Sequence, residues 1–144
     1  MNVGSLTTRP AITITANAHI IAAAVLMRDE DTGFLVVLED GYIVGVLTDR
    51  DIVVRSLASE GPRPDIRVRD IMSREVLVCF EPQAVEDAAA IMGDFQVRRL
   101  PVCDTRDRLV GVLCLDSIAE DYSEQLAGET YGEIVEKRQL PRVG

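Results

Sequence analysis

The sequence is short of the side chains that stack on nucleic-acid bases. It contains no Trp, and aromatic residues make up only 4% of its 144 residues. Acidic residues outnumber basic ones by 24 to 15, which gives a formal net charge of −9 at pH 7. Binding to a phosphate backbone needs clustered Lys and Arg, and binding to single strands needs aromatic platforms. We therefore expect no nucleic-acid partner, whereas a free mononucleotide, which needs only a few local donors, remains compatible with this composition.

Metal ligands, disulfide pairs and membrane-length apolar runs are equally scarce. His19 is the only histidine, and the three cysteines, Cys79, Cys103 and Cys114, show no CxxC spacing. An odd number of cysteines at apolar strand positions is typical of buried, reduced thiols, so we expect a cytoplasmic protein without a metal site. No apolar run approaches the ~20 residues needed to span a bilayer, and the N-terminus lacks the features of a signal peptide. We expect no membrane partner.

Two similar stretches organise the chain. The first, GVLTDRDI, covers residues 45–52, and the second, GVLCLDSI, covers residues 111–118, which is an offset of 66 residues. At this offset the two halves align without a gap from the N-terminus to Ile118. A chance match would not keep register over this length. The chain therefore contains an internal repeat, in which one structural unit occurs twice.

Each copy has the pattern of a β-α-β-β-α unit, so the expected fold class is α/β (α+β), with the two units packed through their sheets. In the first copy we expect strands at 11–15, 34–38 and 42–47, and helices at 17–28 and 49–59. In the second we expect strands at 77–80, 100–103 and 108–113, a helix whose apolar stripe is Ala88, Ile91, Met92 and Phe95, and a closing helix from Ser117 to about Leu126. We further expect Ala22 and Val25 to face the core, as Ala88 and Ile91 do.

Turn residues and the repeat set the boundaries. Residues 1–60 form the first unit, and Gly61-Pro62-Arg63-Pro64 opens a linker at 61–67. Residues 68–127 form the second unit and begin with a short amphipathic turn at 68–72. The tail at 128–144 has no counterpart in the first copy, and a short helix is expected there at 134–138.

The first motif has the features of an anion site. An apolar strand ending at Leu47 runs into a helix, with Thr48 at the N-cap and Asp51 three residues later, which is the spacing of a capping box. Free N–H groups and the helix dipole favour an anion there. The Thr48 hydroxyl could bind a phosphate, and the Asp51 carboxylate could accept both hydroxyls of a ribose. The same pair could instead only cap the helix, and the residues alone leave these two interpretations even.

Together with VRDIM at 68–72 and VRRLPV at 97–102, the two motifs resemble the cystathionine β-synthase (CBS) domain, and the tandem is similar to a stand-alone Bateman module. The resemblance implies two units related by a pseudo-twofold axis, with clefts between them for adenine nucleotides or adenosyl ligands. It also implies a regulatory role, homodimers and no catalysis. It gives Thr48 the phosphate and Asp51 the ribose.

The candidate ligand-binding residues are Thr48, Asp51, Ile14, Val36, Arg98 and Arg99. One of the two arginines could reach a phosphate through its guanidinium fork, or both could be solvated surface residues. The second copy has Cys114 in place of Thr48 and Ser117 in place of Asp51. A thiol is a weak donor, and serine has no carboxylate. We therefore predict that a nucleotide occupies the Thr48–Asp51 site first.

The resemblance thus implies a regulatory module that binds AMP, ADP, ATP or an adenosyl compound and requires no cofactor. We expect a homodimer built on apolar helix faces, such as that of Val53, Val54 and Leu57, and an unidentified regulated protein as partner. The alternative is a ligand-free module for dimerisation and protein interaction. No Ser–His–Asp or paired-carboxylate pattern is apparent, so we expect no enzyme.

Overall fold

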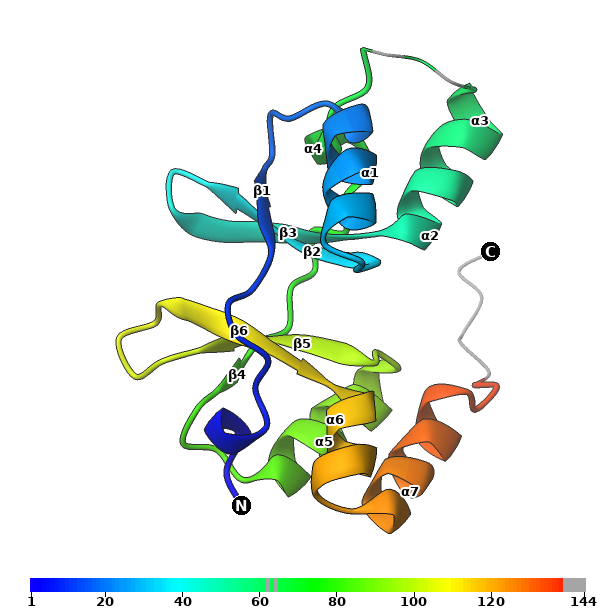
Figure 1. Ribbon diagram of the computed structural model, residues 1–144. Helices are drawn as coiled ribbons and strands as arrows, with labels where there is room; N and C mark the ends of the chain where they lie inside the picture. The colour runs from blue at the N-terminus through cyan, green and yellow to red at the C-terminus, as the bar shows by residue number, and fades with distance from the viewer. Residues whose placement is uncertain (62, 64, 139–144) are drawn as a thin grey trace. The chain divides into compact units, whose positions relative to one another are not determined.

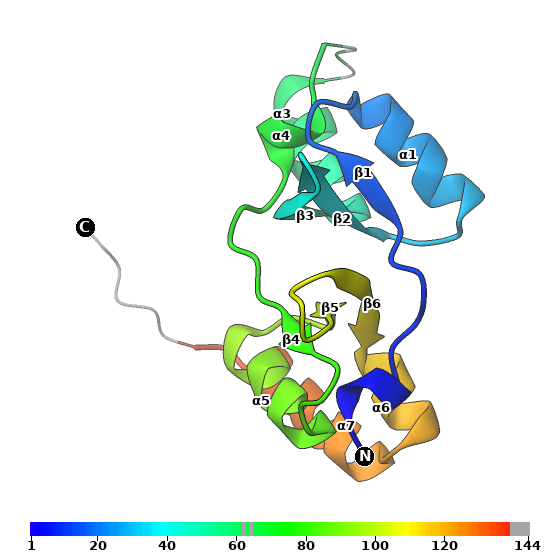
Figure 2. The ribbon, with the colours of Figure 1, turned by 90° about the vertical axis from the view of Figure 1, so that its left-hand side faces the viewer.

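The computed structural model describes residues 1–61, 63 and 65–138 and contains two compact units (Figure 1). The first unit is Pro10–Val76. The second consists of Met1–Arg9 together with the chain from Leu77 onward. Each unit holds one three-stranded sheet, and its helices lie on one face of that sheet (Figures 1 and 2). The expected mixed fold of two β-α-β-β-α units is confirmed.

In the first unit, β1 (Thr13–Thr15) is parallel to β2 (Phe34–Glu39), and β2 is antiparallel to β3 (Tyr42–Thr48). Helix α1 (Ile20–Asp29) makes the crossover that a parallel pair of strands requires. The tight β2–β3 turn uses positive φ at Asp40 (51°) and Gly41 (81°). All three strands lie close to their expected positions.

The core of the first unit lies between the sheet and its helices. From β2, Leu35 and Val37 point into it, and they are joined by Ile20, Ala23 and Met27 of α1. Short helix α4 (Val68–Ile71) adds both of its terminal residues. Our expectation that Ala22 and Val25 face this core is wrong, because both are exposed and Ala23 takes the buried position.

The closing helix of the first unit begins directly where β3 ends. It consists of α2 (Asp49–Asp51), a π-helical segment η2 (Ile52–Leu57) and α3 (Ala58–Glu60), which follow one another without a break. The expected helix at 49–59 is confirmed. Its N-terminus is therefore fixed to the sheet, which positions Thr48 and Asp51.

The second unit repeats this arrangement. Its strands are β4 (Cys79–Phe80), β5 (Arg99–Cys103) and β6 (Leu109–Cys114), and its helices are α5 (Val85–Phe95), α6 (Leu115–Asp121) and α7 (Glu124–Ile134). Strand order and pairing match those of the first unit. A short 3-10 helix, η1 (Val3–Ser5), brings the buried side chain of Val3 into this core.

The segment that precedes each repeat's first strand packs on the other repeat. Ser73, which precedes the second repeat's strands, pairs with Val46 of β3 through two backbone hydrogen bonds of 2.9 and 3.0 Å. Thr8 pairs with Val112 of β6 in the same way, at 2.9 and 3.0 Å. The compact units therefore do not follow the linear order of the repeat, because each takes one pairing segment from the other copy's sequence.

Helix α7 is the main departure from the sequence-based expectation. The helix expected from Ser117 to Leu126 ends at Asp121, and α7 begins after Ser123, whose Oγ accepts a bond from the Leu126 N–H at 3.1 Å. The helix expected at 134–138 is wrong, since α7 ends at Ile134.

Packing of α7 on α5 and α6 gives α5 a broader buried face than α1 has. Gly93 of α5 lies against the Glu133 side chain of α7, and Ala127 and Thr130 of α7 are buried. Ala88 of α5 is buried, whereas its counterpart Ala22 of α1 is exposed. Phe95, expected in the buried stripe, is 54% exposed.

Candidate ligand-binding site

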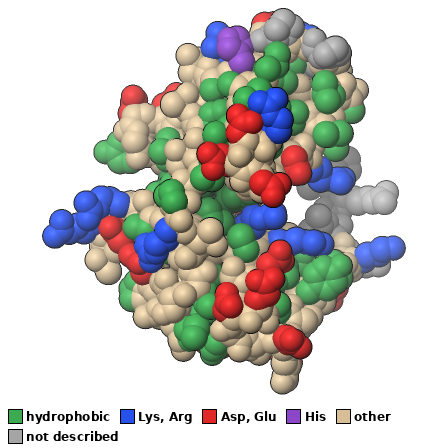
Figure 3. All heavy atoms as spheres, viewed as in Figure 1, with side chains coloured by type: hydrophobic (Ala, Val, Ile, Leu, Met, Phe, Trp, Pro, Cys, Tyr) green, Lys and Arg blue, Asp and Glu red, His purple; other side chains and the backbone are tan. Residues whose placement is uncertain are grey.

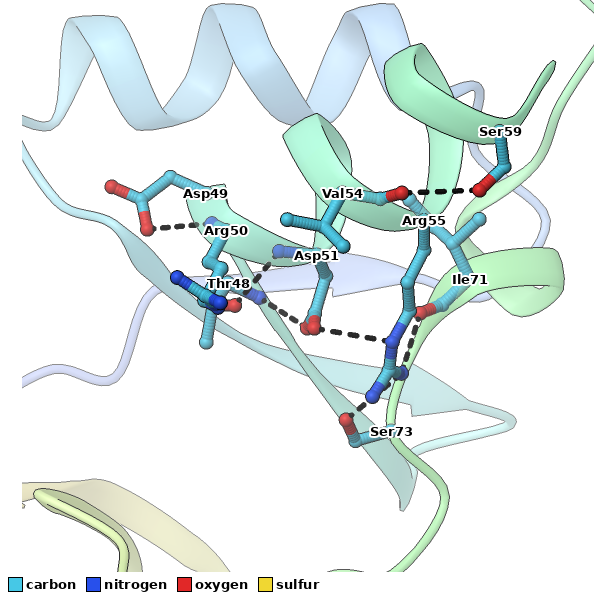
Figure 4. A network of polar contacts seen from close by, with 9 residues as sticks. All are labelled: Thr48, Asp49, Arg50, Asp51, Val54, Arg55, Ser59, Ile71 and Ser73. Carbon is cyan, nitrogen blue, oxygen red and sulfur yellow. Dashed lines mark hydrogen bonds and ion pairs between the residues drawn. The ribbon is translucent and has the colours of Figure 1, made fainter. Parts of the chain in front are cut away.

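Thr48 and Asp51 form a capping box at the start of the closing helix (Figure 4). The Asp51 N–H donates to Thr48 Oγ1 at 3.1 Å, and the Thr48 N–H donates to Asp51 Oδ2 at 2.9 Å. These two bonds satisfy backbone donors that a helix N-terminus otherwise leaves open. The capping box that the spacing predicts is therefore present, and its two bonds hold the side chains beside each other.

The remaining N–H groups of this first turn are also occupied. The Asp49 N–H donates to the Gly33 carbonyl at 3.0 Å, and the Arg50 N–H donates to the Asp49 carboxylate at 2.8 Å. The sequence-based expectation of free backbone donors for an anion is thus wrong. Side-chain donors would have to bind a phosphate here.

Capping leaves two groups of the pair available. The Thr48 hydroxyl accepts a bond from Asp51, but its own proton has no acceptor among the described residues, so it can donate to a ligand. Asp51 Oδ1 makes no hydrogen bond there and lies 3.6 Å from Arg55 Nε in an ion pair. The Asp51 side chain is 12% exposed. One donor and one carboxylate oxygen therefore remain for a ligand that carries an anion and adjacent hydroxyls.

Arg55 is the member of this network that sequence analysis missed. Its Nη1 donates to the Ile71 carbonyl at 3.1 Å and to Ser73 Oγ at 3.2 Å (Figure 4). The i,i+4 spacing from Asp51 could have suggested the ion pair. The bond to Ser73, 18 residues away, had no sequence signal.

The two apolar candidates lie on neighbouring strands of the same unit. Ile14 of β1 is half-buried, and Val36 of β2 is fully buried. Val36 points to the face of the sheet opposite to Leu35 and Val37, because successive strand residues alternate. No side-chain surface remains accessible at Val36.

The two arginine candidates belong to the second unit. The Arg98 guanidinium lies over the ring of Tyr131 on α7, 5.2 Å from its centroid, which is a cation–π contact. The positive charge of Arg99 acts on the Cys114 thiol and favours its ionised form. Tyr131 was not identified from the sequence. Each arginine thus has a partner within its own unit, while Thr48 and Asp51 lie in the first unit.

The second motif has neither a capping box nor the hydroxyl and carboxylate of the Thr48–Asp51 pair at the same positions. Cys114 occupies the N-cap of α6 and makes no side-chain capping bond. Burial raises the pKa of the Cys114 thiol, although the positive charge of Arg99 opposes that shift. Ser117 stands where Asp51 stands and Asp121 where Arg55 stands. The described polar network therefore exists in one copy only.

A cavity of about 280 Å³ lies next to this network in the first unit. Its lining residues are Arg55, Arg63, Asp65, Ile66, Asp70 and Ile71. Arg63 pairs with Asp65 at 2.8 Å, and the Asp70 carboxylate accepts from the Arg67 N–H at 2.8 Å. Because its acidic and basic groups balance, the cavity has no strong preference for an anion.

Within the described ranges, no group of three or more His, Cys, Asp or Glu side chains gathers to hold a metal ion. In the same part of the chain, no helix has the length and apolar character to cross a membrane. The Thr48–Asp51 pair with Arg55 is the candidate ligand-binding site.

Comparison with protein families decides the identity of the fold. The family model of the CBS domain matches the chain twice, at residues 3–57 and 68–124. The chain belongs to the CBS domain family. The CBS domain-containing protein YhcV of Bacillus subtilis is 36% identical over 128 residues, which cover 89% of this chain and 87% of that protein. The resemblance inferred from the two motifs is confirmed.

Solved CBS structures share the fold. The conserved CBS domain protein TA0289 of Thermoplasma acidophilum, of unknown function, superposes with a TM-score of 0.82 at 24% identity, covering 100% of this chain and 83% of its own. The CBS domain pair of protein MJ0100, solved with 5′-methylthioadenosine and S-adenosyl-L-methionine, gives 0.76 at 25%, with coverage of 87% and 98%. CBSX2, solved with AMP, gives 0.71 at 25%, with coverage of 86% and 97%. Structural relatives of this CBS pair therefore bind adenosyl ligands.

Proposed function

We propose that this CBS pair is a regulatory module that binds an adenine nucleotide or a related adenosyl ligand through Thr48 and Asp51. The observation that carries the proposal is which groups of Thr48 and Asp51 the capping box uses. The box fixes both side chains, yet among the described residues the Thr48 hydroxyl proton and Asp51 Oδ1 make no hydrogen bond, although Oδ1 is paired with Arg55. The AMP complex of CBSX2 and the adenosyl complexes of MJ0100 support the ligand class.

In this proposal the two residues have separate roles. The Thr48 hydroxyl donates to a phosphate oxygen, and Asp51 Oδ1 accepts the ribose hydroxyls through its two lone pairs. Since backbone donors of the first turn are occupied, the phosphate contact depends on side chains. Titration calorimetry with AMP, ADP, ATP and S-adenosylmethionine tests the proposal. Saturable binding of one of them supports it, and no binding of any of them overturns it.

A second role, self-association, is favoured by exposed apolar side chains on the helices of the first unit. Val53, Val54 and Leu57 of η2 are 55%, 45% and 48% exposed, and Ile21 of α1 is 57% exposed. Figure 3 shows hydrophobic side chains over the closing helix. In the second unit, α7 packs on the corresponding helices α5 and α6. The helix pair of one repeat is thus covered within the chain, and we infer that a second copy covers the other.

A further inference from the structure

Arg55 contacts two parts of the first unit that are far apart in sequence. On one side, its Nε lies 3.6 Å from Asp51 Oδ1, one turn earlier on the same helix. On the other side, its Nη1 donates to the Ile71 carbonyl and to Ser73 Oγ (Figure 4). A planar guanidinium can serve these partners together because its donors point in fixed and different directions. The side chain is half-exposed and its partners lie near the surface, so Arg55 can be replaced without disturbing the core.

Ser73 is also held through its backbone. Its N–H donates to the Val46 carbonyl, and its carbonyl accepts from the Val46 N–H, at 2.9 and 3.0 Å. Val46 lies two residues before Thr48 on β3, and the first unit ends three residues after Ser73. The Ile71–Ser73 segment therefore pairs with the strand that leads into the candidate site and precedes the chain's passage to the second unit.

We propose that Arg55 is a positioning residue that couples a ligand on Asp51 to the Ile71–Ser73 segment. This inference rests on the proposed function at Thr48 and Asp51. A nucleoside phosphate that donates its ribose hydroxyls to Oδ1 needs the carboxylate in the orientation that Arg55 supports. The same guanidinium holds the segment. Linkage between two sites is reciprocal. A ligand that favours the state in which Arg55 contacts both Asp51 and Ser73 therefore stabilises the Ile71–Ser73 segment. In return, an ordered segment strengthens ligand binding.

The second unit cannot make this connection. At the corresponding positions it has Ser117 for Asp51, Asp121 for Arg55 and Thr7 for Ser73. The Thr7 hydroxyl donates instead to the Val3 carbonyl at 2.8 Å. The coupling is therefore a property of the first unit alone.

The test is amide hydrogen exchange on the full chain with and without saturating AMP, combined with calorimetry. In the wild type, AMP slows exchange at the Ser73 and Val46 amides. In Arg55→Gln these amides exchange about two- to fivefold faster without ligand, the AMP dissociation constant rises by a similar factor, and AMP no longer slows them. Ser73→Ala keeps the Arg55–Asp51 pair, so it should retain AMP affinity within about twofold but reduce the slowing.

Arg28→Gln is the matched control, because it removes the same charge and an exposed ion pair, to Asp29 at 2.9 Å, elsewhere in this unit. It should change neither measurement. If the Ser73 amide of ligand-free Arg55→Gln exchanges at the wild-type rate, Arg55 does not hold the segment. If AMP binds the wild type without slowing amide exchange at Ser73 and Val46, the coupling is overturned. Failure of AMP to bind the wild type overturns the coupling to this ligand and counts against the proposed function. The ligand-free comparison then decides separately whether Arg55 holds the segment.

Discussion

Gly111 of β6 lies directly against the Thr8 backbone, so closely that a Cβ at position 111 would overlap the Thr8 carbonyl oxygen. Gly45 of β3 is its counterpart. A Cβ there would come within 2.7 Å of Met72 Sδ and 2.9 Å of the Ser73 carbonyl. The glycine in each motif is thus required by the close approach of the pairing segment. Neither glycine is required by an unusual φ. Each makes room for a segment that comes from the other repeat.

Gly111→Ala should therefore destabilise the protein by about 1–3 kcal/mol, because the added methyl group meets backbone that cannot rotate away. Gly128→Ala is the matched control. Gly128 lies within α7, and a Cβ added there would have nothing within 4 Å, so alanine should stabilise the helix by about 0.5–1 kcal/mol. Urea denaturation measures both. Equal effects of the two substitutions would contradict the packing of Thr8 on β6.

Stability should also fall at alkaline pH because of Cys79. Burial raises the pKa of this thiol from 9.0 to about 12. Below pH 9 the thiol is protonated in both the folded and the unfolded protein. Between pH 9 and 12 only the unfolded chain loses this proton. The free energy of unfolding should therefore decrease as pH rises through this window, by about 2 kcal/mol at pH 10.5 from Cys79 alone.

The measurement is urea denaturation at about pH 8 and about pH 10.5 for the wild type and Cys79→Ala. The variant is less stable at both pH values because it leaves a small cavity, but its loss between them should be smaller. The same pH-dependent loss in both proteins would show that Cys79 does not cause it.

Self-association predicts a specific response to charge on the exposed helix. Leu57→Glu places a carboxylate where a second copy packs, so the dimer dissociation constant should rise at least about thirtyfold, since burying an unpaired charge costs about 2 kcal/mol or more. Tyr42→Glu is the control, because Tyr42 is 76% exposed on the β2–β3 turn of the same unit. Analytical ultracentrifugation compares them. A monomeric wild type at micromolar concentration, or equal effects of both changes, would argue against this interface.

Features encoded by local spacing could be predicted from the sequence. The gapless repeat located the strands, and the three-residue interval between Thr48 and Asp51 predicted the capping box that the structure contains. Both depend on residues that are neighbours in sequence or that repeat at a fixed offset. Long-range packing is not needed to recognise them.

Features that depend on distant partners could not be predicted. Helix α7 begins at Glu124, inside the stretch where one continuous helix was expected, and it packs on α5, which is far away in sequence. The Asp49 N–H is occupied by the Gly33 carbonyl, which only the folded sheet brings near. Arg55 and Ser73 meet for the same reason.

The most direct test of the account is the affinity of the wild type, Asp51→Ala and Ser117→Ala for AMP, measured by titration calorimetry. Asp51→Ala removes a charged acceptor, and such hydrogen bonds contribute roughly 1.5–3 kcal/mol, so affinity should fall about tenfold to a hundredfold. Ser117→Ala should change affinity little. Melting curves establish that each variant is folded, because Asp51 also caps its helix. Equal losses in the two variants, or undiminished binding in Asp51→Ala, would contradict the account.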